Sequence, residues 1–194
     1  MKIYKLNSST IDYSFFMYNH DKNDKEQYSI SRESRNWHWK SPILYDTVLF
    51  ELRAGDNKKK NYNFDISTFE TPFIIISKKT WLELKDILDP RGILLEINTP
   101  SKRKKFYGYY PTNVIYPSAL NRKYSEYTEY PNGLLIYKYV LDENKIKDDY
   151  LFVVEESISD IFVTEKFKER VEKAGLLGFD FSEEVKIINE KDGK

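Results

Sequence analysis

The chain has 194 residues, and 31 Lys and Arg balance 31 Asp and Glu, so its formal net charge is zero. This length suits one domain or a closely packed pair of subdomains, and the absence of cysteine excludes disulfide bonds and thiolate metal sites. No apolar run approaches the about 20 residues that span a bilayer, and MKIYKLNSST contains no apolar signal-peptide core, so we expect a cytoplasmic protein with no membrane partner.

The charges are distributed unevenly along the chain. Residues 1–125 contain 21 Lys and Arg against 14 Asp and Glu, whereas residues 126–194 contain 10 against 17. The two parts therefore carry balances of +7 and −7. Such an asymmetry can give a molecule one basic and one acidic face. An uneven scatter of solvated charges explains the same numbers, and both interpretations stay open.

The first 70 residues are predicted to form an aromatic-rich N-terminal lobe. A short strand is expected at residues 2–6, and a second apolar run follows at residues 12–19. Trp37 and Trp39 alternate around a histidine, so on a strand both indoles would share one face. They are candidates for partner binding, and the alternative is core packing, because Trp buries a large apolar area.

The next segment predicts a strand, a helix and a second strand. Residues 73–76 are apolar and suit a strand, and Ser77 occupies the position of an N-cap. The helix that follows, to residue 88, places Trp and Leu side chains on one face. A Pro-containing turn ends it, and residues 93–97 form the next strand.

A basic run beside aromatic residues follows at residues 102–110. Four cations, at 102–105, precede three tyrosines, Tyr107, Tyr109 and Tyr110. Cations with stacking aromatics can bind single-stranded nucleic acid, which gives an alternative function for the chain. A hairpin loop of solvated lysines is the other interpretation, and no known nucleic-acid-binding motif accompanies the run.

The acidic part of the chain begins with a tyrosine-rich segment that ends in a Pro-Asn-Gly turn. Strands are predicted at residues 134–141 and 150–155, separated by a charged turn. The acidic side chains of this region are candidates for binding a basic partner. They are Asp148, Asp149, Glu155 and Glu156.

The stretch from residue 158 to residue 181 gives the clearest local prediction. Residues 161–163 suit a strand, and Thr164 is expected to cap the helix that follows. Gly175 is expected at the left-handed C′ position, with Val171 and Leu176 as the apolar pair of a Schellman turn.

A short strand at residues 179–181 is expected to complete this second strand–helix–strand unit. Its alignment with the unit around Ser77 suggests an internal duplication, although amphipathic helices match by composition alone. The fold class is therefore predicted as α+β, with mainly antiparallel sheets, two or three helices and two strand–helix–strand units. Residues 71–188 form the predicted core and residues 189–194 a frayed tail, all in one continuous domain.

No catalytic constellation is visible in the sequence. Nucleophile-elbow, P-loop, dinucleotide and zinc-protease motifs are absent, and the two histidines, His20 and His38, are far apart in sequence. Glu155, Glu156 and Asp160 are the one carboxylate cluster that suits acid–base work. No nucleophile or metal ligand accompanies them, so we expect a non-enzymatic protein without metal or cofactor and keep an enzyme as the last alternative.

A family resemblance supplies a function. The motifs that carry it are Phe152-Val153-Val154, the run from Ser159 to Lys168, the run from Gly175 to Phe181, and the earlier element from Phe73 to Lys79. They resemble the C-terminal signature of the bacterial immunity proteins of polymorphic toxin systems, of the immunity protein 11 and immunity protein 43 type, formerly a domain of unknown function. The resemblance covers roughly residues 70–188, and the first 70 residues match it only loosely.

The resemblance implies a small cytoplasmic protein that binds and neutralises a cognate toxin domain. Its motifs are structural, so it transfers no functional residues, and the paired cysteines of some relatives are absent here. A toxin domain is thus the expected partner, and the acidic C-terminal third could mask a basic nuclease toxin. Nucleic acid is not the expected partner, and the chain's oligomeric state is left open.

Overall fold

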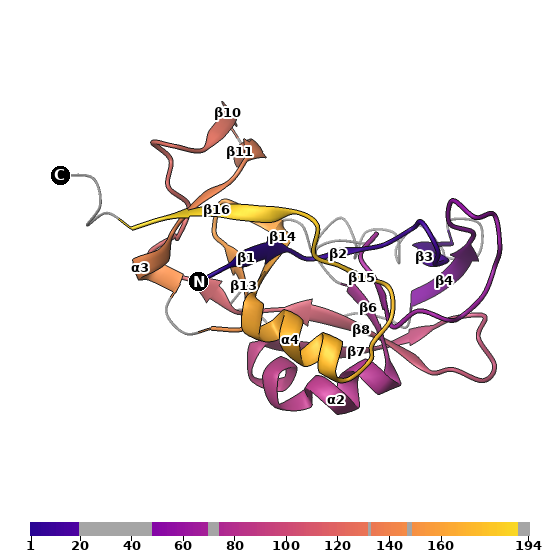
Figure 1. The fold of residues 1–194 in the computed structure, drawn as a ribbon. Coiled ribbons are helices and arrows are strands. Elements are labelled where there is room, and N and C mark those ends of the chain that lie inside the picture. The colour runs from indigo at the N-terminus through magenta and orange to yellow at the C-terminus, as the bar shows by residue number, and fades with distance from the viewer. Residues whose placement is uncertain (20–47, 70–73, 132, 147–148, 190–194) are drawn as a thin grey trace.

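The computed structural model describes residues 1–19, 48–69, 74–131, 133–146 and 149–189. Figure 1 shows a molecule built mainly from strands, with helices along one side, so the broad prediction of an α+β fold is confirmed. The helices are α2 (Lys78–Leu88), α3 (Glu143–Ile146), α4 (Glu165–Lys173) and a 3₁₀ turn, η2 (Asp89–Arg91). The strands of the first half are β1 (Ile3–Lys5), β2 (Asn7–Ser8), β3 (Phe15–Tyr18), β4 (Val48–Arg53), β5 (Ile66–Ser67), β6 (Ile74–Ser77), β7 (Gly92–Asn98) and β8 (Phe106–Pro111). Those of the second half are β9 (Val114–Ile115), β10 (Glu126–Tyr130), β11 (Gly133–Lys138), β12 (Val140–Asp142), β13 (Leu151–Val154), β14 (Ser157–Thr164), β15 (Phe179–Asp180) and β16 (Glu184–Ile188).

Two six-stranded sheets form the body of the molecule. The β1 sheet has the strand order β12-β16-β1-β14-β13-β9, and the β8 sheet has the order β3-β4-β7-β8-β6-β5. Most neighbours are antiparallel, as expected, but three pairs are parallel: β12 with β16, β9 with β13, and β4 with β7. Both sheets are therefore mixed.

The two longer helices follow corresponding strands of the two sheets. Strand β6 precedes α2 and β14 precedes α4. In the β8 sheet, β8 lies between β6 and β7 and is antiparallel to both. In the β1 sheet, β1 lies between β14 and β16 and is antiparallel to both. The segments thus have similar connectivity, although β15 and a loop separate α4 from β16. Their origin by duplication remains a hypothesis.

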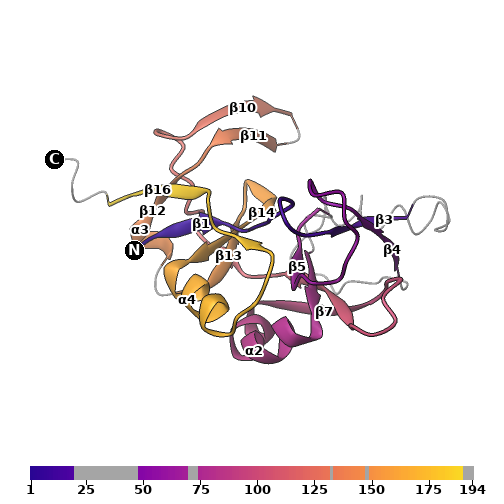
Figure 2. The same cartoon turned by 45° about the vertical axis from the view of Figure 1, so that its right-hand side comes forward.

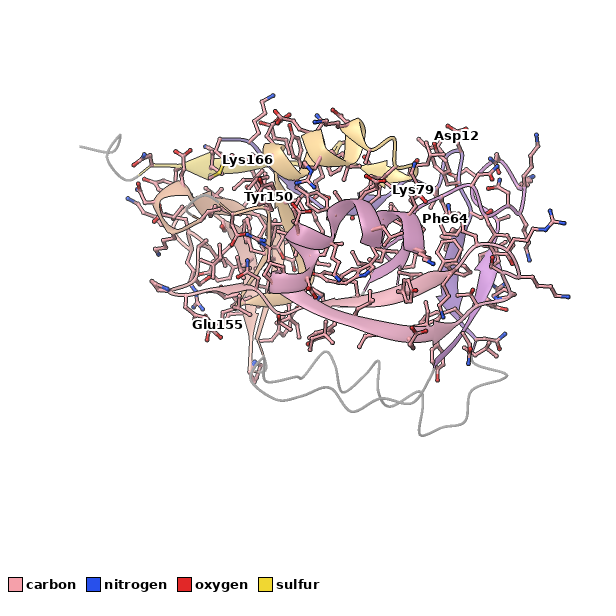
Figure 3. All side chains as sticks on the ribbon, turned by 90° about the horizontal axis from the view of Figure 1, so that it is seen from below. Asp12, Phe64, Lys79, Tyr150, Glu155 and Lys166 are labelled. Carbon is pink, nitrogen blue, oxygen red and sulfur yellow. The ribbon has the colours of Figure 1, made fainter. Side chains whose placement is uncertain are left out.

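One apolar core lies between the helices and both sheets. Helix α2 contributes Leu84, Ile87 and Leu88, and helix α4 contributes Phe167 and Val171. The helices lie side by side in Figures 1 and 3. Side chains from both sheets complete this cluster, so the sheets share a core. Further clusters occupy the other faces of the β1 sheet and the β8 sheet.

The end of α4 matches the predicted Schellman turn. Gly175 has φ of +57°, its amide donates to Glu172 O, and the Leu176 amide donates to Val171 O. These are the two reverse bonds of the motif. The left-handed glycine is therefore confirmed, and it satisfies carbonyl groups that the helix itself leaves free.

The start of α4 differs in one respect from the prediction. Thr164 is the N-cap residue, but its side chain makes no capping hydrogen bond. The hydroxyl instead donates to Asp149 O at 2.8 Å, and the Glu165 amide donates to Lys2 O at 3.0 Å. Backbone groups from distant segments therefore replace the local cap. In α2, by contrast, Ser77 Oγ accepts the Thr80 amide at 3.1 Å, as predicted.

The predicted boundary at residue 70 does not separate two parts of the structure. Strand β1 pairs with β14 on one side and with β16 on the other, so the first residues lie inside the C-terminal sheet. Strands β3, β4 and β5 belong to the same sheet as β6, β7 and β8. Within the described residues, the strands before and after residue 70 therefore share both sheets. Within the same ranges, no helix is long and apolar enough to cross a membrane.

Candidate protein-binding surface

The β10–β11 hairpin projects from the body of the molecule. It forms a two-stranded antiparallel sheet that is separate from the other described strands. Figures 1 and 2 show it above β16 and the β1 sheet. Its two outer edges therefore pair with no described strand. Exposed strand edges present rows of free backbone donors and acceptors, which makes them natural contact points for another chain.

One face of the hairpin is apolar and exposed. Tyr130 lies opposite Gly133, and Thr128 lies opposite Leu135. Because alternate residues of a strand share a face, Tyr130, Leu135 and Tyr137 all lie on the same face of the hairpin. Tyr130, Leu135 and Tyr137 are 54%, 49% and 63% exposed. We call these three residues the hairpin face. It combines large apolar area with phenol groups, the composition typical of protein-binding surfaces.

The opposite face anchors the hairpin to the body. Leu134 and Ile136 are partly buried and pack against the cluster on the outer side of the β1 sheet. At the base, Ser125 Oγ accepts the Val140 amide at 3.0 Å, and the Asn121 amide donates to Val140 O at 2.8 Å. Because the opposite face packs against the body, the hairpin face points away from it.

A polar cavity of about 1080 Å³ adjoins the base of the hairpin. It lies between the segment 117–124, helix α3 and strand β16. Its charged lining residues are Arg122, Lys123, Glu143, Lys145, Glu156 and Lys186. Mixed charges beside an apolar face resemble the polar rim of a protein interface more than a site for one small molecule.

Two of the predicted acidic residues, Asp149 and Glu156, accept hydrogen bonds from other parts of the chain. Asp149 accepts hydrogen bonds from Arg91 Nε, Asn113 Nδ2 and the Tyr150 amide. Burial raises the pKa of Asp149, but these bonds outweigh it and leave that pKa below its ordinary value. Glu156 accepts from Ser118 Oγ and lies 3.5 Å from the Arg122 guanidinium. Both carboxylates therefore join segments of the fold.

Of the other predicted site residues, Glu155 is the one that lies within the described ranges. Glu155 is exposed in the turn between β13 and β14 and is labelled at the edge of the molecule in Figure 3. Trp37, Trp39 and Asp148 lie outside the described residues. Asp149 and Glu156 are thus engaged by donors within the molecule, and partner binding by the four acidic residues stays a prediction.

The predicted carboxylate cluster also has a structural explanation. Asp160 forms an ion pair with Lys5 at 2.7 Å and accepts hydrogen bonds from Tyr139 and Ser157. Burial raises the pKa of Asp160, but these contacts outweigh it, so its pKa lies below the ordinary value. Among the described residues, no group of three or more His, Asp or Glu is placed to hold a metal ion.

The basic-aromatic segment does not form a stacking platform. Tyr109 and Tyr110 are buried in strand β8, which lies inside a sheet. Lys104 bonds Asp65 and Phe64 O, and Lys105 pairs with Glu96. The part of the prediction that relied on these tyrosines for base stacking is therefore wrong, because their rings serve the core.

The hairpin face was not singled out by the sequence analysis, although a signal exists. Leu135 and Tyr137 alternate with Leu134 and Ile136, so the strand is apolar on both faces. In a two-stranded element that packs on one side only, one apolar face must stay exposed. Recognising it requires knowing which face of the hairpin packs against the body, which is a tertiary property.

A scan against protein-family models and a search of curated proteins find no match to this chain. The resemblance to immunity proteins therefore remains a prediction from the motifs.

Proposed function

We propose that this protein binds and neutralises the toxin domain of a bacterial polymorphic toxin system in the cytoplasm, and that the hairpin face is its contact surface. The family resemblance supplies the partner class. The single observation that carries the contact surface is the exposed face of Tyr130, Leu135 and Tyr137 on a hairpin without a second strand neighbour among the described residues.

The chemistry of this face favours a protein partner. Tyrosines supply large contact area with few rotatable bonds, and they are enriched among the residues that dominate binding energy. The ion pair between Glu126 and Lys138, at 3.1 Å on the hairpin, is exposed and fits a polar rim. A partner that covers the face and the cavity beside it would reach the area that specific complexes bury.

The body of the molecule fits the role of a rigid support. In this proposal the two strand–helix–strand segments form the scaffold, and the hairpin with its anchoring residues Leu134 and Ile136 is the element that it presents. Binding by a preformed surface limits the conformational entropy lost on association, which favours tight capture.

Coexpression tests the proposal. The probe is the C-terminal domain of a secreted toxin encoded beside this chain's gene, expressed alone and together with the protein. Relief of growth arrest, with formation of a stoichiometric complex of the purified proteins, supports neutralisation by direct binding. Growth arrest that persists despite soluble protein, or relief without a complex, contradicts it.

Substitutions then locate the surface. Replacing Tyr130 and Tyr137 with Ser should each cost about 1–2 kcal/mol of binding energy, roughly 5- to 30-fold in Kd. The matched controls are Ile11→Ser and Leu82→Ser, which remove comparably exposed apolar side chains elsewhere. If the controls weaken binding and the tyrosine variants do not, the partner is bound on another surface.

A further inference from the structure

We infer that the end of the molecule opposite the hairpin carries a second site, which binds the phosphate backbone of nucleic acid without base readout. It consists of two lysine-rich loops, residues 57–63 and 99–105, which we call the basic loops. The loops contain seven cations, and the five that we assign to the site are Lys58, Lys59, Lys60, Lys102 and Arg103.

The two loops meet although they are 40 residues apart in sequence. Lys104 Nζ donates to Phe64 O at 2.7 Å. A cavity of about 520 Å³ lies between them, lined by Tyr62 and Asn63 from one loop and by the segment 100–104 from the other. The fold therefore brings the end of the first loop against the second.

The charge of the basic loops is largely uncompensated. The five site cations are all exposed, and no ion pair among the described residues involves any of them. Lys105, in the same loop, pairs with Glu96 and is not counted in the site. The cavity lining contains no carboxylate. Lys104 is different, because its ammonium group is neutralised by the buried Asp65 at 2.8 Å. Lys104 thus fixes the loop, and the other cations face solvent.

Side-chain hydrogen bonds to the backbone fix the course of both loops. The Lys59 amide donates to Asn57 Oδ1, and Lys59 O accepts from Ser14 Oγ at 3.0 Å. On the other side, the Lys104 amide donates to Ser101 Oγ at 3.1 Å. Fixed loops keep like charges close together, which is unfavourable unless an anion offsets their repulsion.

The residue types favour phosphate over an acidic protein. Four of the five cations are lysines, which are depleted in protein–protein interfaces, whereas arginine and aromatic residues are enriched there. The phosphate backbone is bound through charge alone, for which lysine suffices. Tyr62 packs near Phe16 and Phe106, with ring centroids 6.2 and 6.3 Å away. Because it is committed to this packing, base stacking is not part of the site.

The basic loops and the hairpin lie at opposite ends of the molecule. In Figures 1 and 2 the loop between β7 and β8 is on the right and the hairpin is at the upper left or top. Phe64, the neighbour of the basic loops, is labelled on the right of Figure 3, and Glu155 on the left. The two sites can therefore be tested separately.

Fluorescence anisotropy with labelled oligothymidylate of about 20 nucleotides tests the site. At about 25 mM NaCl we expect a micromolar Kd that weakens roughly 100-fold by about 100 mM, because five contacts give a slope of about −3.5. Neutralisation by Lys102→Gln with Arg103→Gln should weaken binding about tenfold at low salt and lower the slope of log K against log salt by about 1.4. Both side chains are exposed, so the thermal unfolding midpoint should not change.

The control is Lys123→Gln with Lys186→Gln, which removes the same charge from the cavity beside the hairpin. It should leave oligonucleotide affinity within about twofold. No binding at low salt, or equal losses in both double variants, would overturn the site. So would displacement of the oligonucleotide by polyglutamate of the same charge at the same concentration, because the loops would then serve an acidic protein.

Discussion

Lys104 Nζ lies 2.8 Å from Oδ1 of the buried Asp65. The same carboxylate accepts Ser77 Oγ at 2.7 Å and the Leu177 amide at 2.9 Å. Its partners belong to a basic loop, to the N-cap of α2 and to the segment after α4. One carboxylate therefore connects both helices to strand β5 and the loop beside it.

Asp65→Ala should be among the most destabilising substitutions. It removes three hydrogen bonds, leaves the Lys104 ammonium without its carboxylate and leaves the Leu177 amide without its acceptor, so we expect a loss of about 3–5 kcal/mol in the free energy of unfolding. Urea denaturation measures it. The comparison is Glu96→Ala, which breaks the exposed pair with Lys105 and should change stability little. Equal effects of the two substitutions would contradict a central role for Asp65.

Stability should fall in acid. Burial raises the pKa of Asp65, Asp149 and Asp160, but their hydrogen bonds outweigh it and all three pKa values are lowered. The unfolded value of Asp is about 3.9. A depressed pKa in the fold gives stabilisation that is present above the unfolded value and lost as pH falls through the folded values.

Urea denaturation between about pH 7 and pH 2 checks this dependence. The free energy of unfolding should decline below about pH 4. Asp160→Asn should lower stability at neutral pH and make the acid decline shallower, because one of the three linked groups is removed. A wild-type stability that rises on acidification would show that the carboxylates are not stabilised in the fold.

Gly175→Val should cost about 1–2 kcal/mol, because a Cβ branch is unfavourable at φ of +57°. No atom lies within 4 Å of the position that a Cβ would occupy, so the cost is backbone strain and not a clash. Gly175→Asn, which tolerates the left-handed region, should cost less. An unchanged midpoint for the valine variant in thermal unfolding would argue against the left-handed conformation.

The ion pair between the helices should contribute little. Arg170 donates to both carboxylate oxygens of Asp86 at 2.9 Å, and to Glu83 O at 3.1 Å. These contacts raise the pKa of Arg170 and lower that of Asp86. Because Asp86 is exposed and Arg170 is partly exposed, solvent screening limits the pair to below about 1 kcal/mol. A double-mutant cycle with Arg170→Met and Asp86→Ala measures the coupling, and a value above about 2 kcal/mol would contradict this account.

Local chemistry predicted the helix ends well. The turn at Gly175 depends on residues within one helical turn, and Ser77 caps a helix whose first amides are its nearest donors. Thr164 shows the limit of this reasoning. The Thr164 hydroxyl is placed to cap the helix locally, but it donates to Asp149 O instead, which strand β13 brings close.

Long-range pairing explains what the sequence did not predict. Strand β1 enters a sheet whose other strands are more than 100 residues away in sequence, and no local pattern in Ile3–Lys5 specifies its neighbours. The same applies to Tyr109, which alternation alone could place on either face. The exposure of Tyr137 depends on the other face of the hairpin packing against the body through Leu134 and Ile136.

The most direct test of the proposed function is the affinity of the purified toxin domain for the wild type and for the variant Tyr130→Ser, Leu135→Ser, Tyr137→Ser, measured by calorimetry. We predict a one-to-one complex and a Kd at least about 100-fold weaker for the variant, with Ile11→Ser, Leu82→Ser as the unchanged control. Equal affinity of the wild type and a folded triple variant would contradict the assignment of the hairpin face as the binding surface.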